Sequence, residues 1–280
     1  MNTDMNTNKV YFSALLSERC PLLNGCIVEA LQNYGIKYAY LSGTKDIWCR
    51  DFMPIQLDKS HFVSYRYTPN YLQTKTNIDY QTNIEDVFTM DDKHLQKIKA
   101  HCTAMDLVVD GGNVVKCGDK IVMTDKVFVE NKDKQHDEVE RILRETFQCD
   151  VLFLPWDKSE RYGHSDGIVH YIGDGKILLT NYDDFSINYY NKFRKVLDEH
   201  FEVITLKYKV KETHEDSWVY INYLQVGTLV LVPQLGIEED EQALAQISEV
   251  MPNCKVIGIP ALKAIKDGGA LNCISWNVEL

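Results

Sequence analysis

Five short polar segments in the sequence contain residues that could act on a bound substrate. The segment 163–167, with the sequence GHSDG, places His164 two residues before Asp166. On a β-strand both side chains would share one face, and the carboxylate would raise the proton affinity of the imidazole. Such a histidine can serve as general acid and base near neutral pH. Taken alone, the pair also fits a surface loop held by a local hydrogen bond.

A thiol occurs in the last of the five segments. In the segment 267–273, Cys273 follows the pair Gly268-Gly269, and glycines allow the backbone to approach a ligand closely. A cysteine together with a separate histidine is the minimum for nucleophilic catalysis by a thiol. For Cys273 alone the alternative is a buried structural cysteine.

Carboxylates accompany the thiol and the histidine. The segment WCRDFMP contains Trp48, Arg50 and Asp51, and the segment DGGN begins at Asp110. Taken alone, the first segment also fits a strand end with an Arg–Asp bridge, and the second also fits a turn. Acyl transfer by a thiol and a histidine needs an oxyanion hole rather than several acids, whereas a guanidinium pairs bidentately with carboxylates. Asp51, Asp110 and Asp166 together therefore favour a cationic guanidino substrate, whose central carbon the carboxylates would polarise toward the thiol.

Two local consequences follow from these residues. Carboxylates beside Cys273 should raise the pKa of its thiol above the free value of about 8.5, so the thiolate should form mainly when a cation is bound. On a regular strand, Cys49 rather than Trp48 would share the face of Asp51. We therefore expect either an irregular backbone there or Cys49 as a second thiol near the site.

The elements around the polar segments repeat along the chain. Five amphipathic helices are predicted, with apolar positions in residues 27–34, 95–102, 139–147, 189–197 and 243–251, the second following Asp91 and Asp92. Gly35 is a candidate cap for the first helix, and Pro252 ends the fifth. Each helix precedes a short apolar strand, and these strands begin at residues 38, 106, 151, 203 and 255. A polar segment follows each strand, and further β-rich sequence follows most of them.

This repetition predicts the architecture. The markers Trp48, Gly111, His164, Asn222 and Cys273 are 51 to 63 residues apart, which suits a radial array of small mixed sheets. In such an array the polar segments converge at one end of a central axis. A doubly wound α/β sheet is the alternative. Because no linker divides the chain, we predict a single domain over residues 1–280.

Composition narrows the function classes. The 280 residues are 45% hydrophobic and 25% charged, with 30 Lys and Arg against 41 Asp and Glu, a net charge of −11. Such an acidic chain is a poor candidate for binding nucleic acid or an anionic membrane. The sequence contains neither a signal-peptide pattern nor an apolar run of membrane-spanning length, so we expect a cytoplasmic protein. The eight cysteines show no CxxC pair, which disfavours a zinc site and favours free thiols.

The order of these motifs resembles a known family. The segments WCRDFMP, YINYLQVGTLVLVPQLG and NCISW resemble the agmatine deiminase and bacterial (Porphyromonas-type) peptidylarginine deiminase family of the guanidino-group-modifying superfamily. The resemblance covers nearly the whole chain. It implies a five-bladed α/β propeller (pentein type) with five ββαβ pseudo-repeats, and a reaction that needs no metal and no organic cofactor.

The resemblance also implies residue roles. Cys273 would be the nucleophile, and His164 the general acid and base. Asp51 and Asp166 would bind the guanidinium and take part in catalysis. Trp48 would line the substrate channel.

Other positions match the family less closely. Asp110 stands where the family has Glu; we place it with the substrate-binding residues, with a side chain that would orient His164. Asn222 matches a segment that we interpret as scaffold near the pocket. The chain has Asn272 where agmatine deiminases have His before the cysteine, and Met53 where they have Gly.

The resemblance predicts an agmatine deiminase-like hydrolase that converts a guanidino group into a ureido group. Ammonia would leave through a covalent Cys273 thiouronium intermediate. A peptidylarginine deiminase, an amidinotransferase and a non-catalytic guanidinium- or partner-binding propeller remain as alternatives. The sequence leaves the oligomeric state undetermined. Residues 67–80 are either a lid or rim of the pocket or a plain surface loop.

Overall fold

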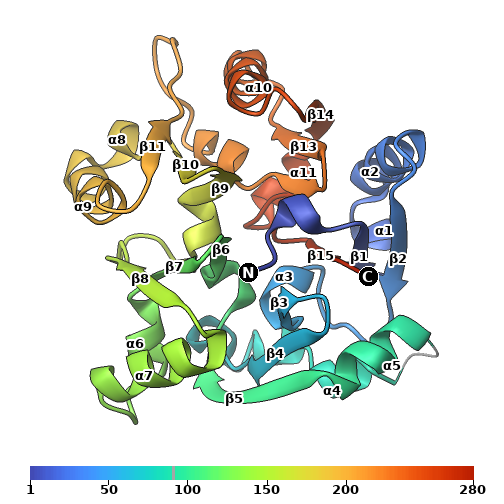
Figure 1. Cartoon of the computed structure of the whole chain (residues 1–280). Coiled ribbons are helices and arrows are strands. Elements are labelled where there is room, and N and C mark those ends of the chain that lie inside the picture. Colours follow the sequence, from blue (N-terminus) through green and yellow to red (C-terminus); the bar gives the residue numbers. More distant parts are fainter. Residues whose placement is uncertain (90–91) are drawn as a thin grey trace.

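Five small sheets surround a central axis (Figure 1). The structure is a computed structural model that describes residues 1–89 and 92–280. In each sheet the first strand along the repeat lies antiparallel to the second, and the second lies parallel to the third. The predicted five-bladed α/β propeller of ββαβ repeats is therefore confirmed, and the doubly wound sheet is wrong.

The strands follow one order in all five sheets. The first sheet contains β15 (Ser275–Val278), β1 (Lys9–Ser13) and β2 (Lys37–Leu41), and the second contains β3 (Ile55–Asp58), β4 (His61–Arg66) and β5 (Cys102–Val108). The third contains β6 (Val115–Cys117), β7 (Lys120–Thr124) and β8 (Asp150–Leu154). The fourth contains β9 (Val169–Gly173), β10 (Lys176–Leu179) and β11 (Glu202–Thr205), and the fifth β12 (Leu224–Val226), β13 (Leu229–Gln234) and β14 (Lys255–Pro260).

A helix joins the second and third strands of every sheet, as the sequence predicts. These helices are α2 (Pro21–Asn33), α5 (Lys93–Ala100), α7 (His136–Phe147), α9 (Ile187–Leu197) and α10 (Glu239–Val250). Shorter helices are α1 (Leu16–Arg19), α3 (Cys49–Phe52), α4 (Ile84–Val87), α6 (Lys126–Glu130), α8 (Tyr182–Phe185) and α11 (Leu262–Lys266). Among the described residues, no helix combines the length and apolar character needed to cross a membrane.

The helix ends follow the sequence signals. Helix α2 ends at Asn33, and Gly35 takes the left-handed conformation (φ 65°) that closes a helix end. The Asp92 carboxylate accepts hydrogen bonds from the backbone N–H groups of His94 and Leu95 at the start of α5. Asp91, which we also expected before this helix, lies outside the described residues.

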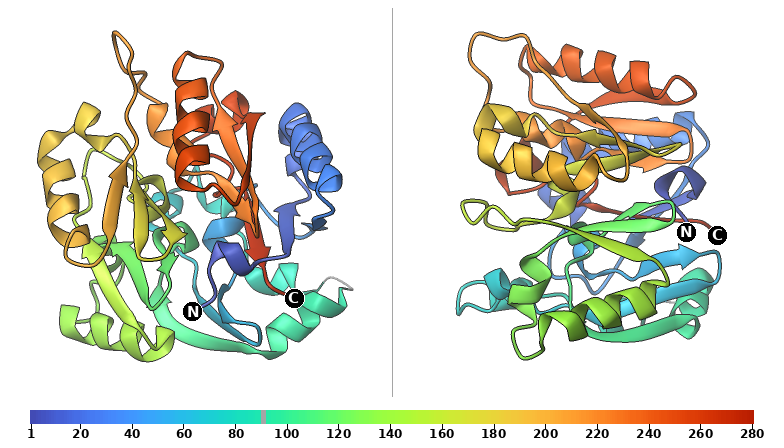
Figure 2. Two further views of the ribbon diagram at one scale, coloured as in Figure 1. Left: turned by 45° about the horizontal axis from the view of Figure 1, so that its top comes forward. Right: turned by 60° about the vertical axis from the view of Figure 1, so that its left-hand side comes forward.

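The C-terminal strand closes the ring of sheets. β15 pairs antiparallel with β1, with Val278 opposite Lys9, so the last strand of the chain lies beside the first (Figure 2). The Trp276 side chain is 2% exposed and packs against the rings of Tyr11 and Phe62, with centroids 5.2 and 6.4 Å away. Its indole N–H donates to the carbonyl of Pro54 at 2.8 Å. One residue of the last strand therefore ties the first and second sheets together.

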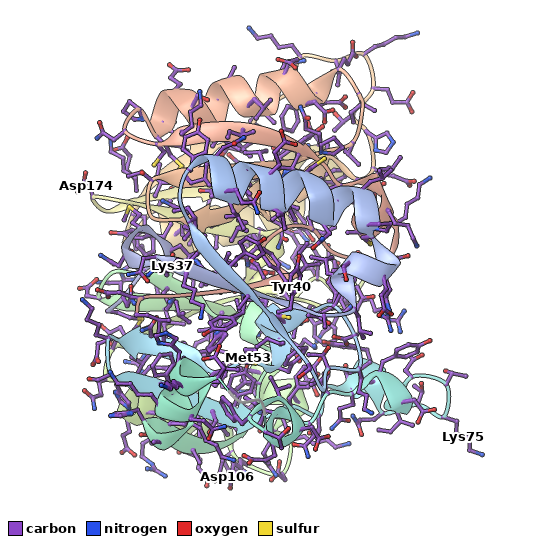
Figure 3. The ribbon with its side chains drawn as sticks, turned by 90° about the vertical axis from the view of Figure 1, so that its right-hand side faces the viewer. Lys37, Tyr40, Met53, Lys75, Asp106 and Asp174 are labelled. Carbon is purple, nitrogen blue, oxygen red and sulfur yellow. The ribbon has the colours of Figure 1, made fainter. Side chains whose placement is uncertain are left out.

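Met53 stands where the family resemblance predicts a glycine, and its side chain lies in the hydrophobic core. Its side chain is 1% exposed and belongs to the hydrophobic cluster that contains Phe52 and Trp276. Figure 3 shows Met53 between the ribbons of the first two sheets, whereas Lys75 and Asp174 project at the periphery. The substitution is therefore accommodated by core packing.

Removing the Trp276 ring should destabilise the closed ring. Trp276→Ala loses a buried aromatic and one hydrogen bond, so we expect the free energy of unfolding to fall by about 3–5 kcal/mol. Urea denaturation followed by circular dichroism measures the change. Leu22→Ala is the control, because Leu22 is 86% exposed and its truncation should cost less than about 0.5 kcal/mol. Equal losses in the two variants would contradict the closing role of Trp276.

Candidate active site

The five polar segments fold as short turns that meet at one end of the axis. They comprise α3, three 3₁₀ turns (Gly111–Asn113, Ser165–Gly167 and Ser217–Ile221) and the turn that precedes β15. Each turn lies between the third strand of one sheet and the first strand of the next, and neighbouring turns contact one another. This connection brings residues from all five repeats together.

Helical turns, rather than strands, place the side chains. His164 precedes a 3₁₀ turn and Asp166 lies within it, so our reason for pairing them on one strand face is wrong. Trp48 and Asp51 are three residues apart around α3 and both line the cavity described below. Cys49 is fully buried in the core and is not part of that lining. The irregular backbone expected for this segment is confirmed, and the Cys49 thiol, although it lies in the same turn, does not line the cavity.

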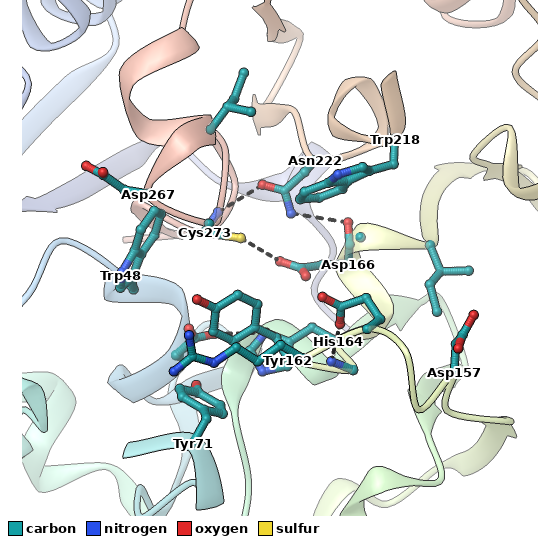
Figure 4. A pocket seen from close by; sticks show the side chains of 18 of the residues that line it. Trp48, Tyr71, Asp157, Tyr162, His164, Asp166, Trp218, Asn222, Asp267 and Cys273 are labelled. Atoms are coloured by element: carbon teal, nitrogen blue, oxygen red, sulfur yellow. Dashed lines mark hydrogen bonds and ion pairs between the residues drawn. The ribbon is translucent and has the colours of Figure 1, made fainter. Parts of the chain in front are cut away.

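A cavity of 1120 Å³ opens at this end of the molecule (Figure 4). The predicted site residues in its lining are Trp48, Asp51, His164, Asp166, Asn222 and Cys273. Asp110 is not in the lining, although we expected it among the substrate-binding residues. The described residues contain no cluster of His, Cys, Asp or Glu side chains arranged to hold a metal ion.

The His164 imidazole lies between two carboxylates. Its Nε2 is 2.9 Å from Oδ2 of Asp110, and its Nδ1 is 3.6 Å from Oδ1 of Asp51. Burial opposes protonation, but the negative charges of Asp51 and Asp110 outweigh it and raise the pKa of His164 to about 9. The imidazole is therefore a cation at neutral pH and can donate a proton.

Asp110 lies behind His164, where its shorter side chain still reaches the ring. The Lys126 ammonium is 2.9 Å from Asp110 Oδ2 and 3.1 Å from Glu130, and it is 1% exposed. Burial alone would raise the pKa of Asp110, but Lys126 and His164 together lower it to about 2. Asp110 is thus a permanent negative charge that orients the imidazole.

Lys126 is a site residue that the sequence reasoning missed. It follows a predicted strand in the segment KIVMTDK, and nothing in that segment separates it from a surface lysine. Only the packing shows that α6 turns its ammonium inward against Asp110 and over the Tyr71 ring, 4.8 Å from the centroid.

The Cys273 thiol faces Asp166 (Figure 4). Sγ donates to Oδ2 of Asp166 at 3.6 Å, and the Cys273 backbone N–H donates to Oδ1 of Asn222 at 3.3 Å. Burial raises the pKa of the thiol well above its usual range, and the charges of Asp166 and Asp51 raise it further. The direction matches the sequence expectation, but burial is the larger cause.

Gly112 allows these groups to pack directly against the backbone. A Cβ atom added to Gly112 would lie 2.7 Å from Oδ1 of Asp51, 2.7 Å from Nδ1 of His164 and 3.3 Å from Oδ1 of Asp166. The Gly112 N–H donates to Asp51 Oδ1 at 3.1 Å. Any side chain here would collide with the carboxylate of Asp51 and the imidazole of His164, which explains why the backbone requires glycine.

The part of the cavity lined by Asp51, Asp166 and Cys273 can hold a planar cation beside a nucleophile. Burial raises the pKa of Asp51 to about 7 and also raises the pKa of Asp166, so both carboxylates gain from a positive partner. A cation held by Asp51 and Asp166 would lie beside the Cys273 thiol and the His164 imidazolium. These are the groups needed for attack by sulfur and protonation of a leaving group.

The outer cavity is aromatic and acidic, which the sequence did not reveal. Six further carboxylates line it, from Asp46, Asp157, Glu160, Glu215, Asp216 and Asp267, against two arginines, Arg19 and Arg161. The rings of Trp156, Trp218 and Tyr162 also contribute to the lining. From the segment 67–80, five residues line the cavity: Tyr67, Tyr71, Leu72, Asn77 and Tyr80. The segment therefore forms part of the rim, and a lid motion stays a prediction.

The family model that describes Porphyromonas-type peptidyl-arginine deiminase matches residues 24–278. The chain belongs to this family. A Listeria monocytogenes relative, provisionally named agmatine deiminase 1, is 24% identical over 233 residues, which are 67% of this chain and 64% of the relative. A Lactococcus lactis relative, provisionally named agmatine deiminase, is 22% identical over 270 residues, covering 82% of this chain and 74% of the relative. The chain thus spans less than two thirds of the Listeria protein.

Solved structures share the fold. The agmatine deiminase of C. jejuni superposes with a TM-score of 0.75 at 16% identity, over 100% of this chain and 95% of that chain. The agmatine deiminase of Enterococcus faecalis gives a TM-score of 0.71 at 18% identity, over 99% and 94%. DDAH from Pseudomonas aeruginosa gives 0.63 at 13% identity, over 97% and 99%. At these identities the superpositions establish the architecture.

The surroundings of Cys273 predict a thiol that ionises only at high pH. Alkylation by iodoacetamide, followed on the Cys273 peptide by mass spectrometry, should show a pH midpoint above the ~8.5 of a free thiol. Asp166→Asn removes the carboxylate 3.6 Å from Sγ and should move that midpoint to lower pH. Half-buried Cys26 in the same digest is the internal control. A Cys273 thiol that is already fully ionised at about pH 6 would exclude this electrostatic account.

Proposed function

We propose that this protein is a deiminase, a C–N hydrolase that converts a guanidino group into a ureido group and releases ammonia. One observation carries the proposal. Asp51, His164, Asp166 and Cys273 come from three separate segments and line one cavity, where the Cys273 thiol lies 3.6 Å from Asp166. This part of the cavity suits a guanidinium because it presents two carboxylates beside a thiol.

Substrate binding would prepare the nucleophile. The guanidinium pairs with Asp51 and Asp166, and Trp48 covers one side of the cavity. Its positive charge offsets the carboxylates that oppose ionisation of the Cys273 thiol. The thiol then loses its proton to solvent, while His164 keeps its own proton because of its raised pKa.

In the first half of the reaction the Cys273 thiolate attacks the central carbon of the guanidinium, and a C–S bond forms. His164 gives its proton to one nitrogen, the C–N bond breaks, and ammonia leaves. A cationic S-alkylthiouronium remains on Cys273, and His164 is now neutral. Asp110 holds the imidazole in place throughout, through its 2.9 Å contact with Nε2.

In the second half, neutral His164 takes a proton from water as the water oxygen attacks the thiouronium carbon. The C–S bond breaks and the Cys273 thiolate leaves. The ureido product then loses a proton, which the released ammonia takes up to form ammonium. His164 again carries its proton. The chain's own carboxylates, thiolate and imidazolium supply the electrostatics, so the proposal includes no metal and no organic cofactor.

A small guanidine with a second cation, such as agmatine, is the favoured substrate. The six carboxylates of the outer cavity support it, as do the names of the relatives. Arginine within a peptide is the second candidate, because a cavity of 1120 Å³ is larger than a small guanidine requires. Amidino transfer to an amine would use the same intermediate with an amine in place of water.

The net charge and the cysteines support two further parts of the proposal, on binding partners and on location. A net charge of −11 supports the proposal that the protein binds neither nucleic acid nor an anionic membrane. All eight cysteines are free thiols, which supports a reducing cytoplasmic location.

Ammonia release from a panel of guanidines tests the function. Agmatine, free arginine, and peptides with N-terminal or internal arginine should be assayed with the native protein and with Cys273→Ala. We expect release from agmatine and its loss, by at least about 10⁴-fold, in the variant, because no other group supplies the nucleophile. Ammonia release that persists in Cys273→Ala, or a correctly folded native protein that is inactive on the whole panel, would contradict the proposal.

The rate should depend on pH through two groups. Below about pH 7, Asp51 takes up a proton and loses the guanidinium; above about pH 9, His164 loses the proton that the leaving nitrogen needs. The profile of kcat/KM should therefore be bell-shaped, with a maximum between these values. Asp110→Asn removes a negative charge that raises both pKa values, so both limbs should move to lower pH. Unchanged limbs in this variant would refute the assignment.

A further inference from the structure

Asp166 has partners that the proposed mechanism does not use. The side-chain amide of Asn272 donates to Oδ2 of Asp166 at 2.7 Å, and the amide of Asn222 donates to the backbone carbonyl of Asp166 at 3.2 Å. Asp166 and Asn272 are each 5% exposed. Two asparagine amides therefore hold Asp166, one at its carboxylate and one at its backbone carbonyl.

Arg50 fixes which way the Asn272 amide points. Its Nη2 donates to Oδ1 of Asn272 at 2.8 Å and to Oδ1 of Asn277 at 2.6 Å, and its Nε donates to the Asn272 carbonyl at 3.4 Å. A guanidinium has only donors, so the amide oxygen of Asn272 must face Arg50. The amide NH₂ group therefore faces Asp166.

This arrangement sorts the two oxygens of Asp166. Oδ2 accepts from Asn272 and lies 3.6 Å from the Cys273 thiol, whereas Oδ1 lies on the side of Gly112, 3.3 Å from the position that a Cβ atom would take there. Without the amide, the carboxyl group could rotate or take up a proton, because burial disfavours its charged form. The other charged or titratable groups that face it are His164, Asp51, Arg50 and Cys273.

We propose that Asn272, locked by Arg50, is a positioning residue that fixes the orientation and the charge of the Asp166 carboxylate beside Cys273, where the carboxylate would meet the guanidinium. The role rests on the proposed function. Asn272 stands where the family pattern has a histidine, so the pairing with Arg50 is argued from this chain alone. It predicts that the amide donor, rather than the size of the side chain, is the required feature.

Asn272→Asp separates the donor from the size. The variant keeps the shape and an acceptor for Arg50, but it puts an oxygen where Asp166 expects an N–H donor. We expect kcat/KM for the best guanidine of the panel to fall by about 10–100-fold, since a hydrogen bond to a charged group is lost. The lower limb of the pH profile should also move to higher pH, because protonation of Asp166, like that of Asp51, weakens guanidinium binding and now occurs more readily.

Asn277→Asp is the matched control. Asn277 accepts from the same Nη2 atom of Arg50, and its contacts do not include Asp166. It therefore receives the same change in charge next to the same arginine. We expect kcat/KM within about threefold of the native value and an unmoved lower limb. Thermal melting shows whether Asn272→Asp is folded. If it is not, Asn272→Ala takes its place, because it removes the donor without adding charge and should lower kcat/KM in the same way.

A titration without turnover separates the two proposals. Carboxyl ¹³C NMR, with Asp166→Asn to assign the resonance, should show a higher midpoint for Asp166 in the Asn272 variants than in the native protein and Asn277→Asp. An identical midpoint in all of them, or equal activity losses in Asn272→Asp and Asn277→Asp, would overturn the positioning role. If the native protein acts on no guanidine, the proposed function fails, and the NMR titration alone decides whether Asn272 controls Asp166.

Discussion

Buried negative charge is the constraint on which the rest of the site depends. Asp51, Asp110 and Asp166 lie within reach of one imidazole, away from water. Like charges at this spacing destabilise one another unless cations are placed among them. His164 and the buried Lys126 neutralise Asp110 completely, but they leave Asp51 with a pKa raised to about 7. The side of the site that faces the cavity therefore lacks positive charge, and a guanidinium would supply it.

The compensating groups lie on the closed side of the site. Lys126 approaches Asp110 from behind, and Arg50 approaches Asp166 from behind through Asn272. The substrate would approach from the cavity, which both Asp51 and Asp166 line. This asymmetry also explains the thiol of Cys273, which stays protonated in the free protein and would ionise when the substrate brings its charge.

The strand that closes the propeller also places the nucleophile. Cys273 lies two residues before β15, the strand that pairs with β1 and completes the first sheet. The Arg50 N–H donates to the Cys273 carbonyl at 3.1 Å, and Trp276 packs between the first two sheets. A nucleophile at the end of the chain is thereby held as firmly as one in the middle.

The sequence alone predicted the repeat and the five helices, because hydrophobic period and motif spacing are local properties of the chain. Together with the family resemblance it also predicted the propeller, and it singled out residues that the structure brings to one cavity. It gave the wrong backbone for His164 and Asp166, since a strand and a helical turn can carry the same short polar segment. Only the tertiary structure decided that Asp110 stands behind the imidazole, that Lys126 is buried, and that Arg50 orients Asn272. Those facts depend on packing between segments 16 to 222 residues apart, and no local pattern records which side chains meet across such distances.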